Sequence, residues 1–244
     1  MKRILLFLFF VLPASALGQP VAHAICNGGD SGNPLTCTTP SVSATGANLI
    51  LIAMATADYT NCTLSDSTGM NTYTGPDVFI NGQDQAQLSL WSKAAPVVSG
   101  TQTFTATCTG SAYIAIAVQA WANATASPND VTPTAATAAP GTASIAPGSI
   151  TPTQAAIVVT AMMWNPVTPS VNNSFTISDT KALAGGLGYG LSFAWKTQGA
   201  VAINPTWTNS DTTYSITAAM ADYKTVVTAA GPKPGTLTVL GDGK

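Results

Sequence analysis

The chain of 244 residues has little charge, with only 7% ionisable residues and a formal net charge of −2. Its ten acids are all aspartates, and Arg3 is its only arginine. Glutamate and arginine favour helices, and no long window shows an apolar period of 3.6 residues, so the sequence predicts essentially no helix. Because so few basic groups could neutralise phosphates, nucleic acid is excluded as a partner.

Histidine is equally scarce, since His23 is the only one. Cleavage after Ala22 would expose His23 as a copper-binding terminus, but such a brace needs a second histidine. A Ser-His-Asp triad cannot be assembled around His23 near the chain start, and no Gly-x-Ser-x-Gly elbow occurs. We therefore predict no catalytic residues. The remaining enzymatic alternative is an Asp-dependent glycoside hydrolase, which needs only two suitably spaced carboxylates, such as Asp66 and a second aspartate.

Residues 1–18 are typical of a secretory signal peptide. Lys2 and Arg3 precede an apolar stretch that is too short to span a bilayer. Small residues at Ala16 and Gly18 favour cleavage after Gly18, with Ala16 as the alternative. We expect a mature chain without a membrane span, located outside the cell or on the cell surface.

The four cysteines are an even number in an exported chain, which predicts disulfides rather than a metal site. In the extended strands expected here, Cys62 shares a face with Leu64, and Cys108 shares a face with Phe104. Both cysteines of this pair can therefore meet in the core. Two other pairings stay open from sequence alone, and the favoured bridges are Cys26–Cys37 and Cys62–Cys108.

Four strand-like blocks recur in the same order in residues 48–121 and 156–223, which indicates a duplicated unit. The paired blocks are 48–54 with 155–161, 62–66 with 175–179, 88–93 with 191–196, and 113–121 with 215–223.

Packing two such halves face to face predicts an antiparallel β-sandwich of jelly-roll or Greek-key type. We expect a single domain over residues 19–230, with 122–154 as the connecting segment and 231–244 as a C-terminal tail. Two small sandwiches in series are the alternative, because segment 122–154 is rich in Ala, Thr and Pro.

Two motifs resemble those of a widespread group of exported bacterial and phage-type β-sandwich proteins. The stretch Asp66-Ser67-Thr68-Gly69-Met70-Asn71-Thr72-Tyr73 is similar to their Asp-Ser-x-Gly-Asn-x-Tyr turn, with Met70 shifting the spacing by one residue. Residues 99–105 resemble their Gly-Thr-x-Thr-x-Thr strand. The resemblance runs over roughly residues 45–225 and implies a β-sandwich without an assigned reaction.

The first half holds about ten more residues than the second between its second and third blocks. Insertions of this kind are common places for function. The inserted loop is either a solvated loop with Asx turns or a calcium site, because carboxylate and amide oxygens suit Ca²⁺. The candidate metal ligands are Asp66, Asn71, Asp77 and Asp84.

Aromatic residues are the other candidates. Alternation places Trp91 opposite Leu88 and Leu90, and places Trp121 with Tyr113 opposite Ile116, so both sets face solvent if the aliphatic residues face the core. Exposed rings can stack on sugars or bind proteins. The alternative is that segment 122–154 covers them, and Trp195 is predicted to be core. The candidate ligand-binding residues are Tyr73, Trp91, Tyr113 and Trp121.

These observations favour an exported, non-catalytic β-sandwich that works as a structural or adhesive module on a surface or in an assembly. A low-charge, threonine-rich surface suits packing against copies of the same chain, which are the expected partners. A carbohydrate-binding module that holds a surface glycan on Trp91 and Trp121 is the alternative, and the Asp-dependent glycoside hydrolase is the second alternative.

Overall fold

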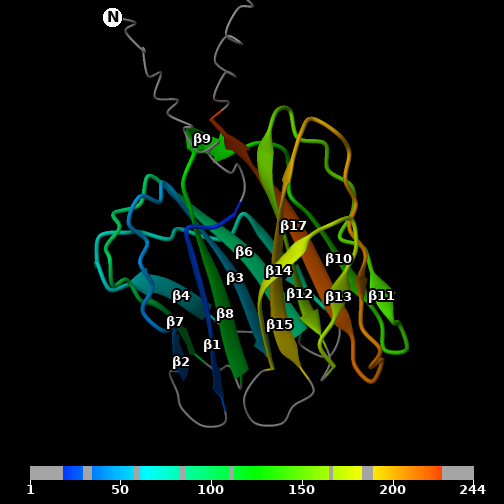
Figure 1. Ribbon diagram of the computed structural model, residues 1–244. Helices are drawn as coiled ribbons and strands as arrows, with labels where there is room; N and C mark the ends of the chain where they lie inside the picture. Colours follow the sequence, from blue (N-terminus) through cyan, green and yellow to red (C-terminus); the bar gives the residue numbers. More distant parts are fainter. Residues whose placement is uncertain are drawn as a thin grey trace, which may run out of the picture.

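The computed structural model describes residues 19–29, 35–57, 61–82, 86–109, 113–164, 167–182 and 189–226, and the structural statements below concern these residues. They form β-strands in four antiparallel sheets and contain no helix (Figure 1). The predicted all-β, antiparallel fold is therefore confirmed. Within these ranges no helix has the length and apolar character needed to cross a membrane.

The first half of the chain builds one large and one small sheet. The large sheet has the strand order β1-β8-β3-β6-β5, and the small sheet has the order β2-β7-β4. The strands are β1 (Ala22–Gly29), β2 (Leu35–Thr38), β3 (Leu49–Ala57), β4 (Asn61–Asp66), β5 (Val78–Asn81), β6 (Ala86–Ala94), β7 (Phe104–Thr109) and β8 (Tyr113–Trp121).

The second half builds a large sheet of order β10-β17-β12-β15-β14, with β9 paired to β17, and a small sheet of order β11-β16-β13. The expected connecting segment 122–154 thus supplies three strands of this half. The strands are β9 (Ala124–Asn129), β10 (Thr134–Ala138), β11 (Ser144–Ile145), β12 (Ala156–Trp164), β13 (Ser170–Val171), β14 (Thr176–Ala182), β15 (Gly190–Gln198), β16 (Trp207–Thr208) and β17 (Ile216–Thr225).

The two halves have the same strand order. Counted from β1 and from β10, the first, eighth, third and sixth strands are neighbours in each large sheet, and the second, seventh and fourth form each small sheet. This is the order of a jelly roll in which the fifth strand has joined the sixth. The common order is an observation, whereas descent from one duplicated unit stays a prediction.

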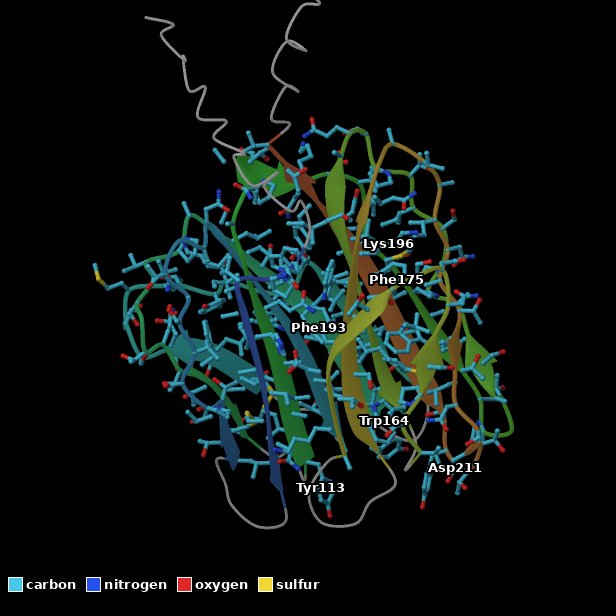
Figure 2. All side chains as sticks on the ribbon, viewed as in Figure 1. Tyr113, Trp164, Phe175, Phe193, Lys196 and Asp211 are labelled. Atoms are coloured by element: carbon cyan, nitrogen blue, oxygen red, sulfur yellow. A yellow bond between two sulfur atoms is a disulfide. The ribbon has the colours of Figure 1, made fainter. Side chains whose placement is uncertain are left out.

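The four sheets are stacked as four layers, with the small sheets outside and the large sheets between them (Figure 1). Three hydrophobic cores fill the three gaps, so each half is a sandwich with its own core and the two sandwiches share a third. We call these the first core, the second core and the interface core. Phe193 lies in the interface core, between the two sandwiches (Figure 2).

Alternation along the central strands explains how one strand serves two cores. Leu49 and Leu51 of β3 enter the interface core, whereas Ile50 and Ile52 enter the first core. All nine residues of β3 are buried. A continuous apolar run is what a strand covered on both faces requires, and β3 has such a run.

Strand pairing corrects two of the four block matches. Leu49 pairs with Trp121 across the sheet, and Ile157 pairs with Tyr223. Leu49 and Ile157 also both point into the interface core, so they are equivalent positions. The alignment of 48–54 with 155–161 is therefore shifted by one residue. The match of 62–66 with 175–179 is also wrong, since β4 lies in a small sheet and β14 lies in a large one.

Both favoured disulfides are present. Cys26–Cys37 joins β1 to β2, with a Cα–Cα distance of 6.0 Å, and therefore fastens the large sheet to the small one. Cys62–Cys108 joins the paired strands β4 and β7 of the small sheet, with a Cα–Cα distance of 4.1 Å. Two disulfides are typical of a protein that folds in an oxidising compartment.

The second sandwich has no disulfide among its described residues and fills its core with large aromatic side chains. The side chain of Trp207 is fully buried in the second core, and its indole Nε1 donates a hydrogen bond of 2.9 Å to Thr160 Oγ1. Trp164 packs beside Gly190, where an added Cβ would lie 2.2 Å from the ring. Phe175 lies in the second core at the entry to β14 (Figure 2).

Candidate functional site

The Asp66 turn is held together by hydrogen bonds from its own residues. Oδ1 of Asp66 accepts from the backbone N–H of Thr68 at 2.9 Å and from the Thr68 hydroxyl. Oδ2 accepts from Asn71 Nδ2 at 2.7 Å and from the Tyr73 hydroxyl at 3.2 Å. Burial, together with the Asp66 carboxylate, raises the pKa of Tyr73 well above its usual range. Both oxygens of Asp66 are thus committed to closing an Asx turn.

The predicted calcium ligands do not converge. Asn71 bonds to the backbone of Val97 at 2.8 Å through both its amide oxygen and its amide nitrogen, so it fastens the loop. Asp77 lies at a different place, where Oδ2 accepts from the Tyr223 hydroxyl at 2.7 Å. Asp84 lies outside the described residues. In the described ranges, no three His, Cys, Asp or Glu side chains form a group that could hold a metal ion.

Trp91 does not face solvent, contrary to the expectation from sequence. Its side chain is 8% exposed and belongs to the first core. Alternation itself was applied correctly, because Trp91 points away from the face of Leu90. The expectation failed because the small sheet gives this second face a cover of its own. The indole Nε1 donates to Ser89 Oγ at 2.8 Å, which fixes the ring.

Trp121 is also buried, at 2% exposure, and it points to the opposite side of the same sheet, into the interface core. The interface core around it includes Ile157 and Tyr223 of the second sandwich and Ala124 of segment 122–154. Trp195 meets it edge to face, with ring centroids 5.3 Å apart. The Trp121 indole donates to Gln119 Oε1 at 3.0 Å, and Gln119 Nε2 donates to Ser178 Oγ at 2.8 Å. Trp91 and Trp121 therefore form no shared platform.

Tyr113 and Trp195 pack at the margin of this interface core. Both are partly buried against it. Trp195 therefore packs on the core, as predicted, although it is only partly buried. The ring of Tyr113 is partly covered as well, so it is not a fully exposed binding surface.

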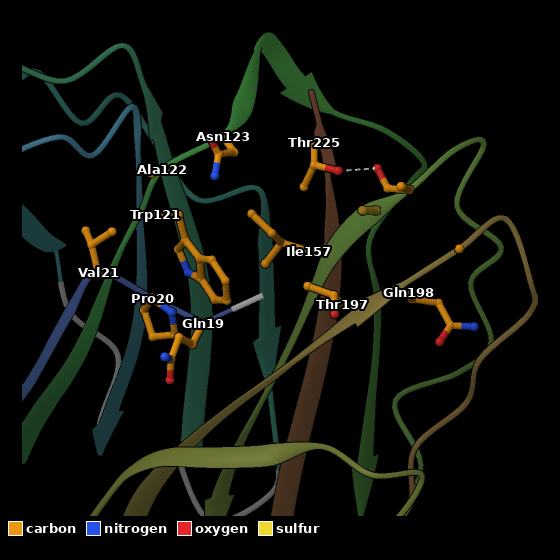
Figure 3. A pocket seen from close by; sticks show the side chains of 13 residues that line it. Gln19, Pro20, Val21, Trp121, Ala122, Asn123, Ile157, Thr197, Gln198 and Thr225 are labelled. Atoms are coloured by element: carbon orange, nitrogen blue, oxygen red, sulfur yellow. Dashed lines mark hydrogen bonds between the residues drawn. The ribbon is translucent and has the colours of Figure 1, made fainter. Parts of the chain in front are cut away.

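A cavity of about 630 Å³ opens between the two sandwiches, and we call it the seam pocket. Figure 3 shows Trp121 and Ile157 lining it, with neutral amide and hydroxyl side chains around them. These polar residues are Gln19, Asn123, Thr197, Gln198 and Thr225. None of the residues that line the pocket is charged, so it offers binding surface without acid, base or nucleophilic chemistry.

A second pocket of about 440 Å³ lies on the face of the first large sheet that points away from the second sandwich. We call it the Trp91 pocket, because Trp91 lines it together with Pro76 and with Phe79 of β5. Met54 and Cys62 also line it, and the polar lining residues are Thr56, Asn61, Gln87 and Ser89. Sequence reasoning singled out Trp91, but it did not single out Gln87 or Asn61.

The remaining described aspartates have structural partners. Asp179 accepts from His23 Nδ1 at 3.0 Å and so ties β14 to β1 across the edge of the interface. Asp222, only 2% exposed, accepts the backbone N–H of Val131 at 3.2 Å. Burial raises the pKa of Asp222 to about 6. Asp130 accepts two hydrogen bonds from Thr153.

No protein-family model, no curated protein and no solved structure matches this chain. The case for function therefore comes from the geometry above.

Proposed function

We propose that the chain is an exported, non-catalytic β-sandwich protein that works as a structural or adhesive surface module. The observation that carries the proposal is chemical: both main pockets are lined entirely by neutral side chains, whereas the described acids hold turns, loops or strands in place. A site of this composition can bind a ligand or another surface, but it supplies no group to react.

Export is supported by two independent features. The pattern over residues 1–18 is typical of a signal peptide that directs a chain to the secretory pathway. The disulfides Cys26–Cys37 and Cys62–Cys108 fit an oxidising destination outside the cytoplasm.

The Asp66 geometry gives no support to the glycoside hydrolase alternative. A catalytic acid or nucleophile of this class needs an oxygen free to meet the substrate. The two oxygens of Asp66 instead accept four hydrogen bonds from residues of the same turn.

Large apolar side chains on the outside favour contacts with copies of the chain. Val201 is 62% exposed and Met70 is 70% exposed, on opposite sandwiches, and Val167 is 44% exposed. With only 7% charged residues, little electrostatic repulsion opposes such contacts.

The test measures both modes of the proposed function on the mature chain beginning at residue 19. Light scattering after size exclusion, over a hundredfold range of concentration, should show reversible association, and Val201→Lys should reduce it. Coated beads should in addition adhere to a cell-wall or polysaccharide surface. A chain that is strictly monomeric and fails to adhere would contradict the proposed function.

A further inference from the structure

The Trp91 pocket has one apolar wall made of rings. The indole of Trp91 is held by its hydrogen bond to Ser89, so it is pre-positioned. Phe79 of β5 pairs with Ser89 across the sheet and is 54% exposed. Its neighbours Val78 and Ile80 pack against the interface core, so Phe79 points to the other face, where the pocket lies. An exposed aromatic ring beside a fixed indole is a surface suited to an apolar ligand face.

The opposite wall is polar. Gln87 is 4% exposed, and its Oε1 accepts from the Thr56 hydroxyl at 3.2 Å. This bond orients the Gln87 amide, which lines the pocket. Asn61 at the start of β4 adds an exposed amide. Oriented amide donors and acceptors bind hydroxyl groups well, because each hydroxyl both donates and accepts.

The absence of charged side chains among the lining residues of the pocket favours a neutral ligand. None of its lining residues is ionisable, because its one cysteine, Cys62, is disulfide-bonded. A sulfated, phosphorylated or carboxylated ligand would therefore lose water without gaining a counter-charge. The volume of about 440 Å³ is within the usual range for sites that hold a small ligand.

We propose that the Trp91 pocket binds a neutral pyranose sugar of a surface glycan. The CH-rich face of the ring packs on Trp91 and Phe79, and the hydroxyl groups bond to the amides of Gln87 and Asn61. The inference rests on the adhesive role proposed above and specifies what the module adheres to. It also replaces the predicted platform of Trp91 and Trp121 with a pocket that contains only the first of these.

The experiment probes the mature chain on an array of neutral, sulfated and sialylated glycans, followed by calorimetry with the best neutral oligosaccharide. Phe79→Ala removes one ring from an exposed position, so the fold should persist. Val97→Ala, at a position 42% exposed and outside the pocket, is the matched control. Gln87→Met tests the polar wall with a side chain of similar shape. We expect about tenfold weaker binding for Phe79→Ala and for Gln87→Met, and no change for Val97→Ala.

Each outcome decides between the inference and the function it rests on. Neutral-glycan binding that falls with both pocket variants and not with the control supports the inference. Binding restricted to charged glycans, or binding that all variants share, overturns it. Adhesion or self-association without any glycan binding also overturns it, while leaving the adhesive module standing. Circular dichroism and intact disulfides in each variant exclude misfolding as the cause.

Discussion

The two sandwiches have the same strand order, but different kinds of residue stabilise their cores. The first uses two disulfides, and three of the four cysteines are buried in its core. The second has none of the cysteines and fills its core with Trp164, Trp207 and Phe175. The small sheet of the first sandwich has strands of four to six residues, whereas that of the second has strands of only two.

The difference shows that topology and the source of stability are separable. A short-stranded sheet has few backbone hydrogen bonds to hold it in place, so it depends on what its side chains bury. A covalent bridge instead restricts the unfolded chain and needs little buried area. The first sandwich therefore depends on its two bridges, whereas the second depends on its buried rings.

The strongest way to break this comparison is to remove the central ring of the second sandwich. Trp207→Ala deletes a fully buried indole and the hydrogen bond to Thr160, so we expect a loss of about 4–5 kcal/mol in the free energy of unfolding. Urea denaturation followed by circular dichroism measures this loss. Val201→Ala, at an exposed site of the same half, should change stability by less than about 0.5 kcal/mol. A cost for Trp207→Ala below 1 kcal/mol would refute the role given to the ring.

The matching change in the first sandwich removes a bridge. Replacing Cys62 and Cys108 by alanine opens a loop of 46 residues, for which loop entropy predicts a loss of about 4 kcal/mol. The same replacement at Cys26 and Cys37 opens a loop of 11 residues and should cost about 3 kcal/mol. Parallel urea titrations measure both values. If the shorter loop proves the more costly, native packing rather than chain entropy explains the bridges.

Much of this fold could be predicted because its strands obey simple alternation. The doubly buried run at β3, the absence of helix and both disulfides follow from residue pattern and cysteine faces. The number of layers could not be predicted, since the short strands β11, β13 and β16 carry two residues each and leave no periodic signal. The error at Trp91 has another cause, because the strands of the small sheet on its side, β4 and β7, were expected but not recognised as a separate sheet that covers this face.

Only part of the Trp91 pocket could be predicted, because the burial of a strand residue depends on which sheet covers it. The region of Phe79 was singled out as an insertion, but the block match behind that insertion is wrong, because β5 and β14 hold the same place in the two large sheets. Gln87 carries no signal in the sequence, because a buried glutamine in a strand cannot be told from an exposed one without knowing what covers it. The calcium prediction grouped Asp66 with Asp77 because they are close in sequence, but they hold different parts of the fold.

The comparison extends to the two edges of the interface between the sandwiches. At one edge the buried Tyr223 hydroxyl bonds to Asp77, close to the buried Asp222. At the other edge Asp179 bonds to His23, whose side chain is 48% exposed. We call the first edge closed, because Tyr223 and Asp222 are buried there, and the second edge open, because His23 is in contact with water. The stability of the two edges should therefore respond differently to pH and to mutation.

The closed edge predicts stability that depends on pH. Because burial raises the pKa of Asp222 to about 6, the folded protein holds a proton that the unfolded chain, with a value near 3.8, releases. Stability should therefore increase as the pH falls from 8 to 5, by about 1 kcal/mol, and the gain should be lost as the pH rises through 6. The Asp130 carboxyl beside it has a lowered pKa, held down by its bonds to Thr153, and acts only at lower pH. Urea titrations at several pH values measure the trend, and Asp222→Asn should abolish it; an unchanged trend in that variant assigns it to another group.

The open edge should contribute least. The bond between His23 and Asp179 spans the two sandwiches, but the half-exposed imidazole lets water replace it at the carboxylate, so His23→Ala should cost about 1 kcal/mol. Tyr223→Phe, which leaves Asp77 without its buried donor, should cost more, at about 2 kcal/mol. A double-mutant cycle of His23→Ala with Asp179→Ala isolates the pair itself, and its coupling energy should shrink further in 1 M salt. Equal costs at the two edges would mean that exposure does not set the strength of these contacts, and the distinction between a closed and an open edge would have to be abandoned.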